Sequence, residues 1–176
     1  MATEHLSPTK IIEGIIITVV GGIILFFIIN GCERSDQTCP ESAVIVDKIF
    51  VTVDAKVYWN DTGIQLQKGD CLEFTATGNW WNGINTTGPD GDGDIGSPEC
   101  LGCPVTDANL GELIGRIGNS APFRIGGTAI HTINQEGVLL LAMNENMGYC
   151  VDEREGSCYD DNNGIVDVKI TVYRIE

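Results

Sequence analysis

The chain has few of the residues and motifs with which enzymes perform catalysis. Among its 176 residues there are only two histidines, His5 and His131, and neither stands in a recognisable motif. A G-x-S-x-G segment, which places a nucleophilic serine, is absent from the sequence, and so is the H-E-x-x-H segment of zinc proteases. A single histidine in a strand-like stretch such as TAIHTI is usually a packed or surface residue. The sequence therefore argues against an enzyme.

Basic residues are also scarce. Ten Lys and Arg stand against 25 Asp and Glu, which gives a net charge of −15, carried mostly by the chain beyond residue 31. A protein that binds nucleic acid needs clustered cations to neutralise phosphates, so this composition excludes nucleic acid as a partner. An acidic surface is compatible with cations, neutral sugars or a basic protein partner, and also with plain solubility.

One long apolar run lies near the N-terminus. Residues 11–29 read IIEGIIITVVGGIILFFII, in which Glu13 is the only charged residue. A helix of about 20 residues crosses the ~30 Å hydrocarbon core of a bilayer, so residues 11–30 are predicted to form a transmembrane helix after a short tail at 1–10. Lys10 before the run, with Glu33 and Asp36 after it, places the tail in the cytoplasm. We expect a single-pass membrane protein whose main domain is periplasmic or extracellular.

Seven cysteines agree with an oxidising compartment. Cys32 follows the apolar run in INGC, which resembles a bacterial lipoprotein cleavage box and makes this residue a candidate for lipidation. C-x-x-C at 100–103 is also found in redox, zinc and haem proteins, but Pro104 stands where haem attachment needs histidine, and the acidic surroundings disfavour a reactive thiolate. Structural disulfides are favoured for the remaining six: Cys39, Cys71, Cys100, Cys103, Cys150 and Cys158.

Beyond a polar linker at residues 31–43, apolar residues recur with a period of two. Such alternation is typical of half-buried antiparallel strands and occurs at Val51, Val53, Ala55, Val57 and Trp59, at Leu72, Phe74 and Ala76, and at Val166, Val168, Ile170 and Val172. Turn sequences separate further candidate strands at 110–117, 122–125 and 137–143. No second amphipathic helix is evident. Residues 44–176 are therefore predicted to form an all-β domain, a jelly-roll-like antiparallel β-sandwich.

The segment GPDGDGDIG at 88–96 carries three carboxylates at alternate positions. Asp90, Asp92 and Asp94 match the first three ligands of an EF-hand loop. Ile95 and Leu101 then stand where that loop requires Gly and Glu, and strands rather than helices flank it. An EF-hand is excluded.

A second oxygen-rich set comes from two segments far apart in the sequence. NEN at 144–146 ends one predicted strand, and DDNNG at 160–164 begins the last one. An antiparallel arrangement brings these ends together. Calcium takes six to eight oxygen ligands, which carboxylates and amides supply, but an Asn/Asp/Gly turn that needs no ion is an equally good interpretation. The residues concerned are Glu145, Asp160, Asp161, Asn162 and Asn163.

Several segments, in this order, resemble the PA-IL (LecA-like) domain of calcium-dependent galactophilic lectins: KGDCLEFTATGNW, GPDGDG, LGELIGRIGNSAPFRIG, GVLLLAMNEN and DNNGIVDVKITV. The resemblance implies a β-sandwich with one Ca²⁺ at an edge, which also coordinates two sugar hydroxyls directly. Carried over by position, the metal ligands are Glu145, Asp161, Asn162 and the backbone oxygen of Asn82. The GPDGDGDIG loop then lies at the sugar-binding rim, which gives the expected ligand-binding residues Asp90, Asp92, Glu145 and Asp161.

The sequence departs from the lectin pattern in three ways. Glu145 and Asp161 stand where the lectins have Asp and Asn. The loop between the two calcium segments is longer and contains CVDEREGSC, and the His and Gln with which these lectins hold the sugar are missing from GPDGDGDIGSPEC. Calcium binding is therefore better supported than galactose binding.

Two functions are consistent with these observations. The first is a membrane-anchored, extracytoplasmic, lectin-like domain that binds carbohydrate with the help of calcium. The alternative is a non-catalytic accessory subunit of a multi-subunit membrane complex, respiratory or photosynthetic, whose acidic domain docks a protein partner. The missing sugar-binding pair favours the alternative, as do Glu13 and the small residues Gly14, Gly21 and Gly22, which could pack against other helices.

Overall fold

The computed structural model describes short strands within residues 10–28, and the backbone and side chains of residues 38–92, 102–149 and 157–175, save the side chain of Tyr149. The chain divides into two compact units, Met1–Asp36 and Gln37–Glu176.

The first unit contains three strands where a transmembrane helix is predicted. Strands β1 (Lys10–Ile12), β2 (Ile15–Val20) and β3 (Ile23–Ile28) pair antiparallel in the order β1-β2-β3. The helix over 11–30 is thus not confirmed, and none of the described residues lies in a helix long and apolar enough to cross a membrane. The prediction rested on apolar length alone. Every residue of β2, IIITVV, is β-branched, and such side chains favour extended backbone over helix.

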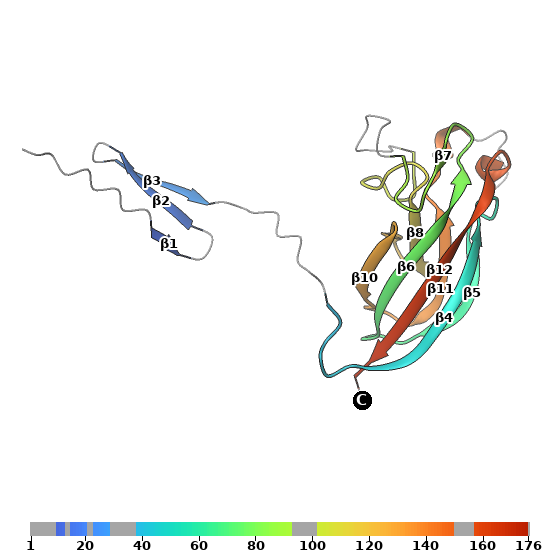
Figure 1. Ribbon diagram of the computed structural model, residues 1–176, viewed down its shortest axis with the longest axis horizontal. Helices are drawn as coiled ribbons and strands as arrows, with labels where there is room; N and C mark the ends of the chain where they lie inside the picture. The colour runs from blue at the N-terminus through green and yellow to red at the C-terminus, as the bar shows by residue number, and fades with distance from the viewer. Residues whose placement is uncertain are drawn as a thin grey trace, which may run out of the picture. The chain divides into compact units, whose positions relative to one another are not determined.

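The second unit is an antiparallel β-sandwich (Figure 1). One sheet has the order β10-β6-β12-β4, with β7 paired to β6, and the other has the order β5-β11-β8-β9. The first sheet consists of β4 (Val44–Asp54), β6 (Cys71–Trp81), β7 (Thr86–Thr87), β10 (Thr128–Thr132) and β12 (Asn163–Arg174). The second consists of β5 (Asn60–Leu66), β8 (Leu113–Ile117), β9 (Phe123–Arg124) and β11 (Gly137–Met143). Two short 3₁₀ helices, η1 (Met147–Tyr149) and η2 (Ser157–Tyr159), follow β11.

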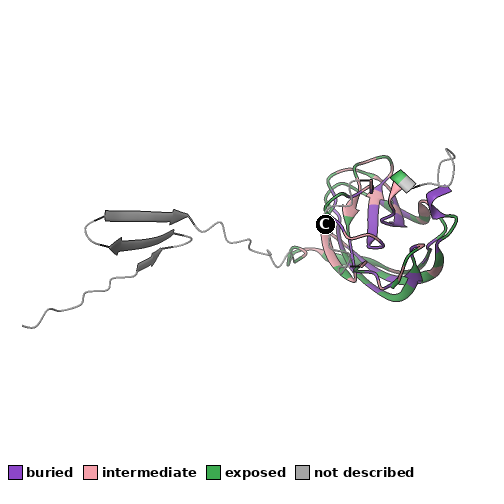
Figure 2. Cartoon of the chain, turned by 90° about the horizontal axis from the view of Figure 1, so that it is seen from above, coloured by how far each residue is buried: buried purple, intermediate pink, exposed green. Residues whose placement is uncertain are grey.

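The core lies between the two sheets, as the period-two pattern predicts. In β6, Leu72, Phe74 and Ala76 are buried while the residues between them are exposed, and β12 alternates in the same way. These side chains pack with Leu139 and Leu141 of β11 in one cluster. Figure 2 shows the resulting mixture of buried and exposed residues around the sandwich. Burial of this apolar surface is the main force that holds the sheets together.

The strand predicted to continue to Trp59 ends earlier. β4 stops at Asp54, and Val57, predicted to face the core, is 41% exposed. The Asn60 side chain accepts a hydrogen bond from the Asp54 N–H at 3.0 Å and donates to the carbonyls of Asp54 and Val57 at 3.1 and 3.3 Å. These local bonds close a turn in place of further strand, which is a common role of asparagine.

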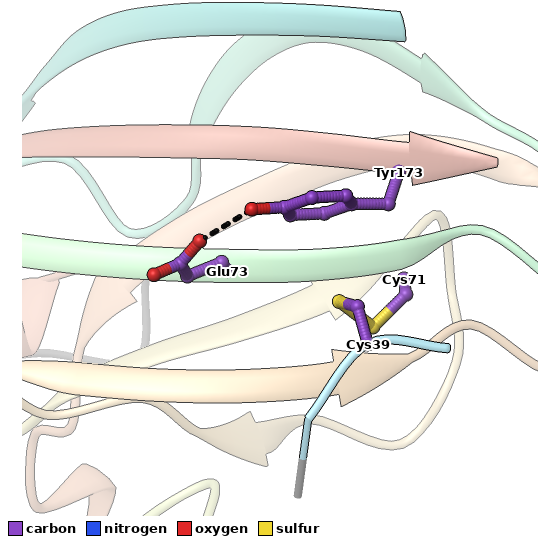
Figure 3. Close-up of a disulfide and its surroundings, with 4 residues drawn as sticks. All are labelled: Cys39, Cys71, Glu73 and Tyr173. Carbon is purple, nitrogen blue, oxygen red and sulfur yellow. Dashed lines mark hydrogen bonds between the residues drawn. A yellow bond between two sulfur atoms is a disulfide. The ribbon is translucent and has the colours of Figure 1, made fainter. Parts of the chain in front are cut away.

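A disulfide joins the segment before β4 to the first residue of β6. Cys39 and Cys71 are bonded (Figure 3), which confirms one pair of the predicted disulfide cysteines. Nearby, Tyr173 Oη donates a 2.8 Å hydrogen bond to Glu73 Oε2. Cys103 and Cys158 are also disulfide-bonded. The other three cysteines, Cys32, Cys100 and Cys150, lie outside the described residues.

Asp70 and Arg174 make a bidentate ion pair at this end of the sandwich. Arg174 Nε and Nη2 lie 2.6 and 2.7 Å from the two Asp70 oxygens, and the Asp70 side chain is 1% exposed. The hydrogen bonds from Arg174 hold the pKa of Asp70 below its usual range, assisted by a bond from the Gln67 N–H and opposed by burial.

We expect this pair to make the folded state sensitive to acid. Because the folded-state pKa of Asp70 is lowered, its contribution to stability is complete above the unfolded pKa of about 4 and is lost as the pH falls through the folded value. Asp70→Asn should lower the urea midpoint at pH 7 and flatten its decline between neutral and acid pH. Urea denaturation of both proteins over this pH range checks this, and parallel pH curves would show that Asp70 contributes nothing.

Candidate functional site

Segments from both sheets meet at one end of the sandwich. The last residue of β6, Trp81, is directly paired with the first residue of β12, Asn163. Asn82, just after β6, and Asn162, just before β12, therefore lie at the same end, toward which β6 points in Figure 1. Glu145 reaches this end from the other sheet, two residues after β11. The predicted convergence of NEN and DDNNG is thus observed.

Hydrogen bonds hold the segment before β12 against the end of β11. Tyr159 is fully buried, and its Oη donates a 2.8 Å hydrogen bond to the carbonyl of Met143, the last residue of β11. The Asn162 N–H donates to the Tyr159 carbonyl at 3.2 Å. Tyr159, which the sequence analysis did not identify, therefore fixes the distance between the segments that carry Glu145 and Asn162.

Three of the four predicted metal-binding residues are buried polar side chains that lack full hydrogen bonding. Asn82, Glu145 and Asn162 are 3%, 7% and 1% exposed. Five buried side-chain atoms among the described residues have no hydrogen-bond partner, and three of them are Asn82 Nδ2, Glu145 Oε2 and Asn162 Oδ1. An unsatisfied buried polar atom costs about 1–3 kcal/mol, so an ordered water or a bound ligand is expected to complete these atoms.

The Glu145 carboxyl group shows the electrostatic character of this edge. Burial raises its pKa to about 7, and the nearby negative charge of Asp161 also raises it. The Asn146 N–H, which donates to Glu145 Oε1 at 2.8 Å, and the Asn162 side chain lower this pKa but do not offset burial. A cation between Glu145 and Asp161 would remove the cost of keeping two carboxylates close together in a partly buried site.

Asp161 lies against a glycine that the sequence analysis did not identify. Gly83 has a φ of +80°, and a Cβ added there would lie 2.5 Å from Asp161 Oδ2. Only glycine adopts this backbone readily and leaves room for the carboxylate. The signal in the sequence is the Asn82–Gly83 dipeptide after a strand, which is typical of a tight turn. Asn82 closes this turn, since its Oδ1 accepts hydrogen bonds from the Ile84 and Asn85 N–H groups.

The two predicted rim residues, Asp90 and Asp92, have different surroundings. Asp92 Oδ2 accepts a 2.7 Å hydrogen bond from Asn85 Nδ2, so it lies on the same turn as Asn82. Asp90 Oδ1 instead accepts a 2.7 Å bond from the Gly127 N–H, beside the start of β10. The structure therefore connects Asp92 to the turn at the candidate edge, whereas Asp90 is hydrogen-bonded to a different loop.

Asn144, in the NEN segment, supports the site without facing it. It is 0% exposed, and its amide exchanges hydrogen bonds with the backbone of Val105 and donates to two further carbonyls, of Ala108 and Asn109. Glu112, whose N–H donates to Asn109, is in turn paired with Arg124 at 2.9 Å. These bonds fix the loop that precedes β8 next to the strand end that carries Glu145.

The oxygen donors at the edge fit a hard cation such as Ca²⁺. They are two carboxylates, Glu145 and Asp161, and the neutral oxygens of Asn82 and Asn162; Ca²⁺ prefers oxygen ligands of this kind, whereas zinc prefers nitrogen and sulfur. Within the described part of the chain, no cluster of three or more His, Cys, Asp or Glu is arranged to hold a metal. The candidate site therefore depends on amide and backbone oxygens as well as acidic residues.

Comparison with known proteins agrees with a lectin-like fold. No family model matches the chain, and no curated protein does. A solved structure described as "EclA N-terminal domain; PllA-like lectin" is similar, with a TM-score of 0.51 and 23% sequence identity, over 76% of this chain and 99% of that one. The chain thus has the fold of a PllA-like lectin domain, while the narrower resemblance to the PA-IL family stays a prediction.

Proposed function

We propose that the β-sandwich is a non-enzymatic domain that binds carbohydrate through a calcium ion held at the Asn82–Glu145–Asp161–Asn162 edge. The observation that carries this proposal is the presence, at one end of the sandwich, of two buried acceptor oxygens without a hydrogen-bond partner, Glu145 Oε2 and Asn162 Oδ1. The lectin-like fold supports it. In the proposed setting, the segment before residue 37 anchors the domain to a membrane, with the domain on the extracytoplasmic side.

Each residue has a defined role in this proposal. Glu145 Oε2, the Asp161 carboxylate, Asn162 Oδ1 and the Asn82 carbonyl would hold the ion. Ca²⁺ accepts six to eight oxygens, so the protein leaves positions that neutral sugar hydroxyls or water can occupy.

Exposed apolar side chains beside the edge suit a sugar ring. Trp81 and Ile84, on either side of Asn82 and Gly83, are 39% and 59% exposed. Trp80 in contrast is buried, and its Nε1 donates to the Gly111 carbonyl at 2.8 Å, so only one tryptophan of the pair is available. An exposed indole can stack on the apolar face of a pyranose.

A glycan array tests the proposal. The full-length protein in detergent should bind a subset of neutral glycans in calcium, and a chelator should abolish that binding. Asp47→Asn serves as control, since Asp47 is an exposed carboxylate on β4 that accepts a hydrogen bond from the adjacent Lys48 N–H. Its binding should equal wild type. An array without any chelator-sensitive hit would contradict the proposal. The accessory-subunit alternative stays a prediction, which co-purification of a partner from membranes would support.

A further inference from the structure

A hollow lies away from the calcium edge, between the turn after β8 and the turn after β10. Its volume is about 330 Å³, which is at the lower limit for small-molecule sites. Nine residues line it: Ile117, Ser120, Ala121, Phe123, His131, Thr132, Ile133, Asn134 and Gln135.

This hollow is at the opposite end of the sandwich from the calcium edge. Thr132 pairs with Cys71, the first residue of β6, whereas Trp81 at the other end of β6 adjoins the candidate calcium site. An eleven-residue strand at about 3.3 Å per residue separates its ends by about 33 Å. A molecule bound in the hollow would therefore not contact the ion.

None of the lining side chains is an acid, a lysine or an arginine. In a chain with a net charge of −15 this makes the hollow unusual. Burial lowers the pKa of His131 and so disfavours a charge on its ring, although its bond to the Arg124 carbonyl acts in the opposite direction. A neutral ligand is favoured here, since a charged one would find no counter-ion in the lining.

One wall of the hollow is aromatic. The Phe123 and His131 rings pack with their centres 4.4 Å apart. His131 Nε2 lies 2.6 Å from the Arg124 carbonyl oxygen. Because a carbonyl only accepts hydrogen bonds, Nε2 carries the proton, and Nδ1 of the neutral ring is left as an acceptor. A ring with an apolar C–H face could pack against this wall.

The lining also offers amides and hydroxyls. Gln135 Nε2 donates to the Ile117 carbonyl at 3.0 Å, which fixes the side chain and leaves its amide oxygen as an acceptor. Asn134 and Thr132 are exposed beside it, and Ser120 Oγ is held by bonds to Ile117 and Ala121. Hydroxyl groups, which both donate and accept, match this mixture better than a purely apolar ligand would.

We propose that this hollow is a second saccharide-binding site, independent of calcium, which takes a neutral pyranose with one face against Phe123 and His131. Its polar partners are the amides of Asn134 and Gln135. Together with the calcium edge it would give the domain two sites at opposite ends, and a branched or surface-bound glycan could then be held with greater avidity than either site provides.

Saturation-transfer NMR in the presence of a chelator tests the proposal. The probes are the methyl glycosides of glucose, galactose, mannose, N-acetylglucosamine and fucose, added to full-length protein in a detergent without a sugar headgroup. At least one glycoside should show saturable transfer at millimolar concentration. Ala121→Arg should fill the hollow, and Asn134→Asp should place a charge in it; each should weaken the binding at least tenfold. Both positions are exposed, so the fold should tolerate the changes.

Two control variants separate this site from the calcium edge. Ser42→Arg adds the same side chain as Ala121→Arg at an exposed turn outside the hollow and should leave binding unchanged. Glu145→Gln should also leave chelator-resistant binding unchanged while it impairs the calcium site. The proposal fails if no glycoside shows transfer in chelator, if transfer survives both Ala121→Arg and Asn134→Asp, or if Glu145→Gln removes it. If the glycan array shows no chelator-sensitive binding while transfer in chelator persists, the calcium-site proposal fails and the second-site proposal stands.

Discussion

Glu145→Gln is expected to change stability in opposite directions without and with calcium. In chelator, wild type keeps a buried carboxyl group with an unpartnered Oε2 next to the negative Asp161. A neutral amide of the same shape is less costly to bury, so the variant should be more stable by roughly 1 kcal/mol. In calcium the order should reverse, because wild type gains the binding free energy of the ion and the variant has lost a charged ligand.

The expected loss of calcium affinity is at least about 100-fold, or roughly 2.8 kcal/mol. Calorimetric titration with Ca²⁺ gives the affinities, and urea denaturation in chelator and in saturating calcium gives both stabilities. The Asp47→Asn control should match wild type under every condition, since it removes an exposed carboxylate far along β4. Equal stabilisation of wild type and Glu145→Gln by calcium would show that the ion binds elsewhere.

Of the substitutions considered, removal of the Cys39–Cys71 disulfide is expected to lower the free energy of unfolding most. The bond joins residues 32 positions apart and closes a loop that includes β4 and β5. In the chain-entropy account, a closed loop of this length restricts the unfolded state enough to stabilise the fold by about 3–4 kcal/mol. That is a large share of the roughly 5–15 kcal/mol typical of a whole domain.

The double variant Cys39→Ser/Cys71→Ala tests this without leaving an unpaired buried thiol. Cys71 is 2% exposed, and alanine fits its place without adding a buried polar group. Urea denaturation under non-reducing conditions should show the loss, while Ser42→Ala, in the same disulfide-bridged loop, should leave stability nearly unchanged. A loss below about 1 kcal/mol would mean that the unfolded chain is already restricted in other ways.

The strands could be predicted from the sequence because their signal is local. β6 and β12 alternate between apolar and polar residues, and both are strands, as expected, of the same sheet, with their apolar side chains in the core. The end of β4 could not be predicted, because it depends on side-chain hydrogen bonds from Asn60 to Asp54 and Val57, which a count of apolar positions does not reveal. The transmembrane helix predicted for the apolar N-terminal run stays unconfirmed, since length and hydropathy do not distinguish helix from strand in IIITVV.

The candidate site could be predicted from the sequence only in part. NEN follows β11 and DDNNG leads into β12, so the two segments meet where the chain passes from one sheet to the other. Asn82 lies beside Asn162 because β6 pairs antiparallel with β12. The different roles of adjacent residues could not be predicted in this way. Asn144 supports a loop while Glu145 lies at the edge, and Gly83 makes room for Asp161; these roles depend on burial and on the turn after β6, which only the three-dimensional structure shows.

Anomalous diffraction from crystals of the full-length protein grown in calcium tests calcium binding at this edge most directly. It locates the ion without reference to activity or to a particular sugar. We expect one strong anomalous peak at the end of the sandwich, about 2.3–2.6 Å from oxygens of Glu145, Asp161 and Asn162. A peak at Asp90 instead, or crystals in millimolar calcium without any peak at this edge, would contradict the proposed calcium site.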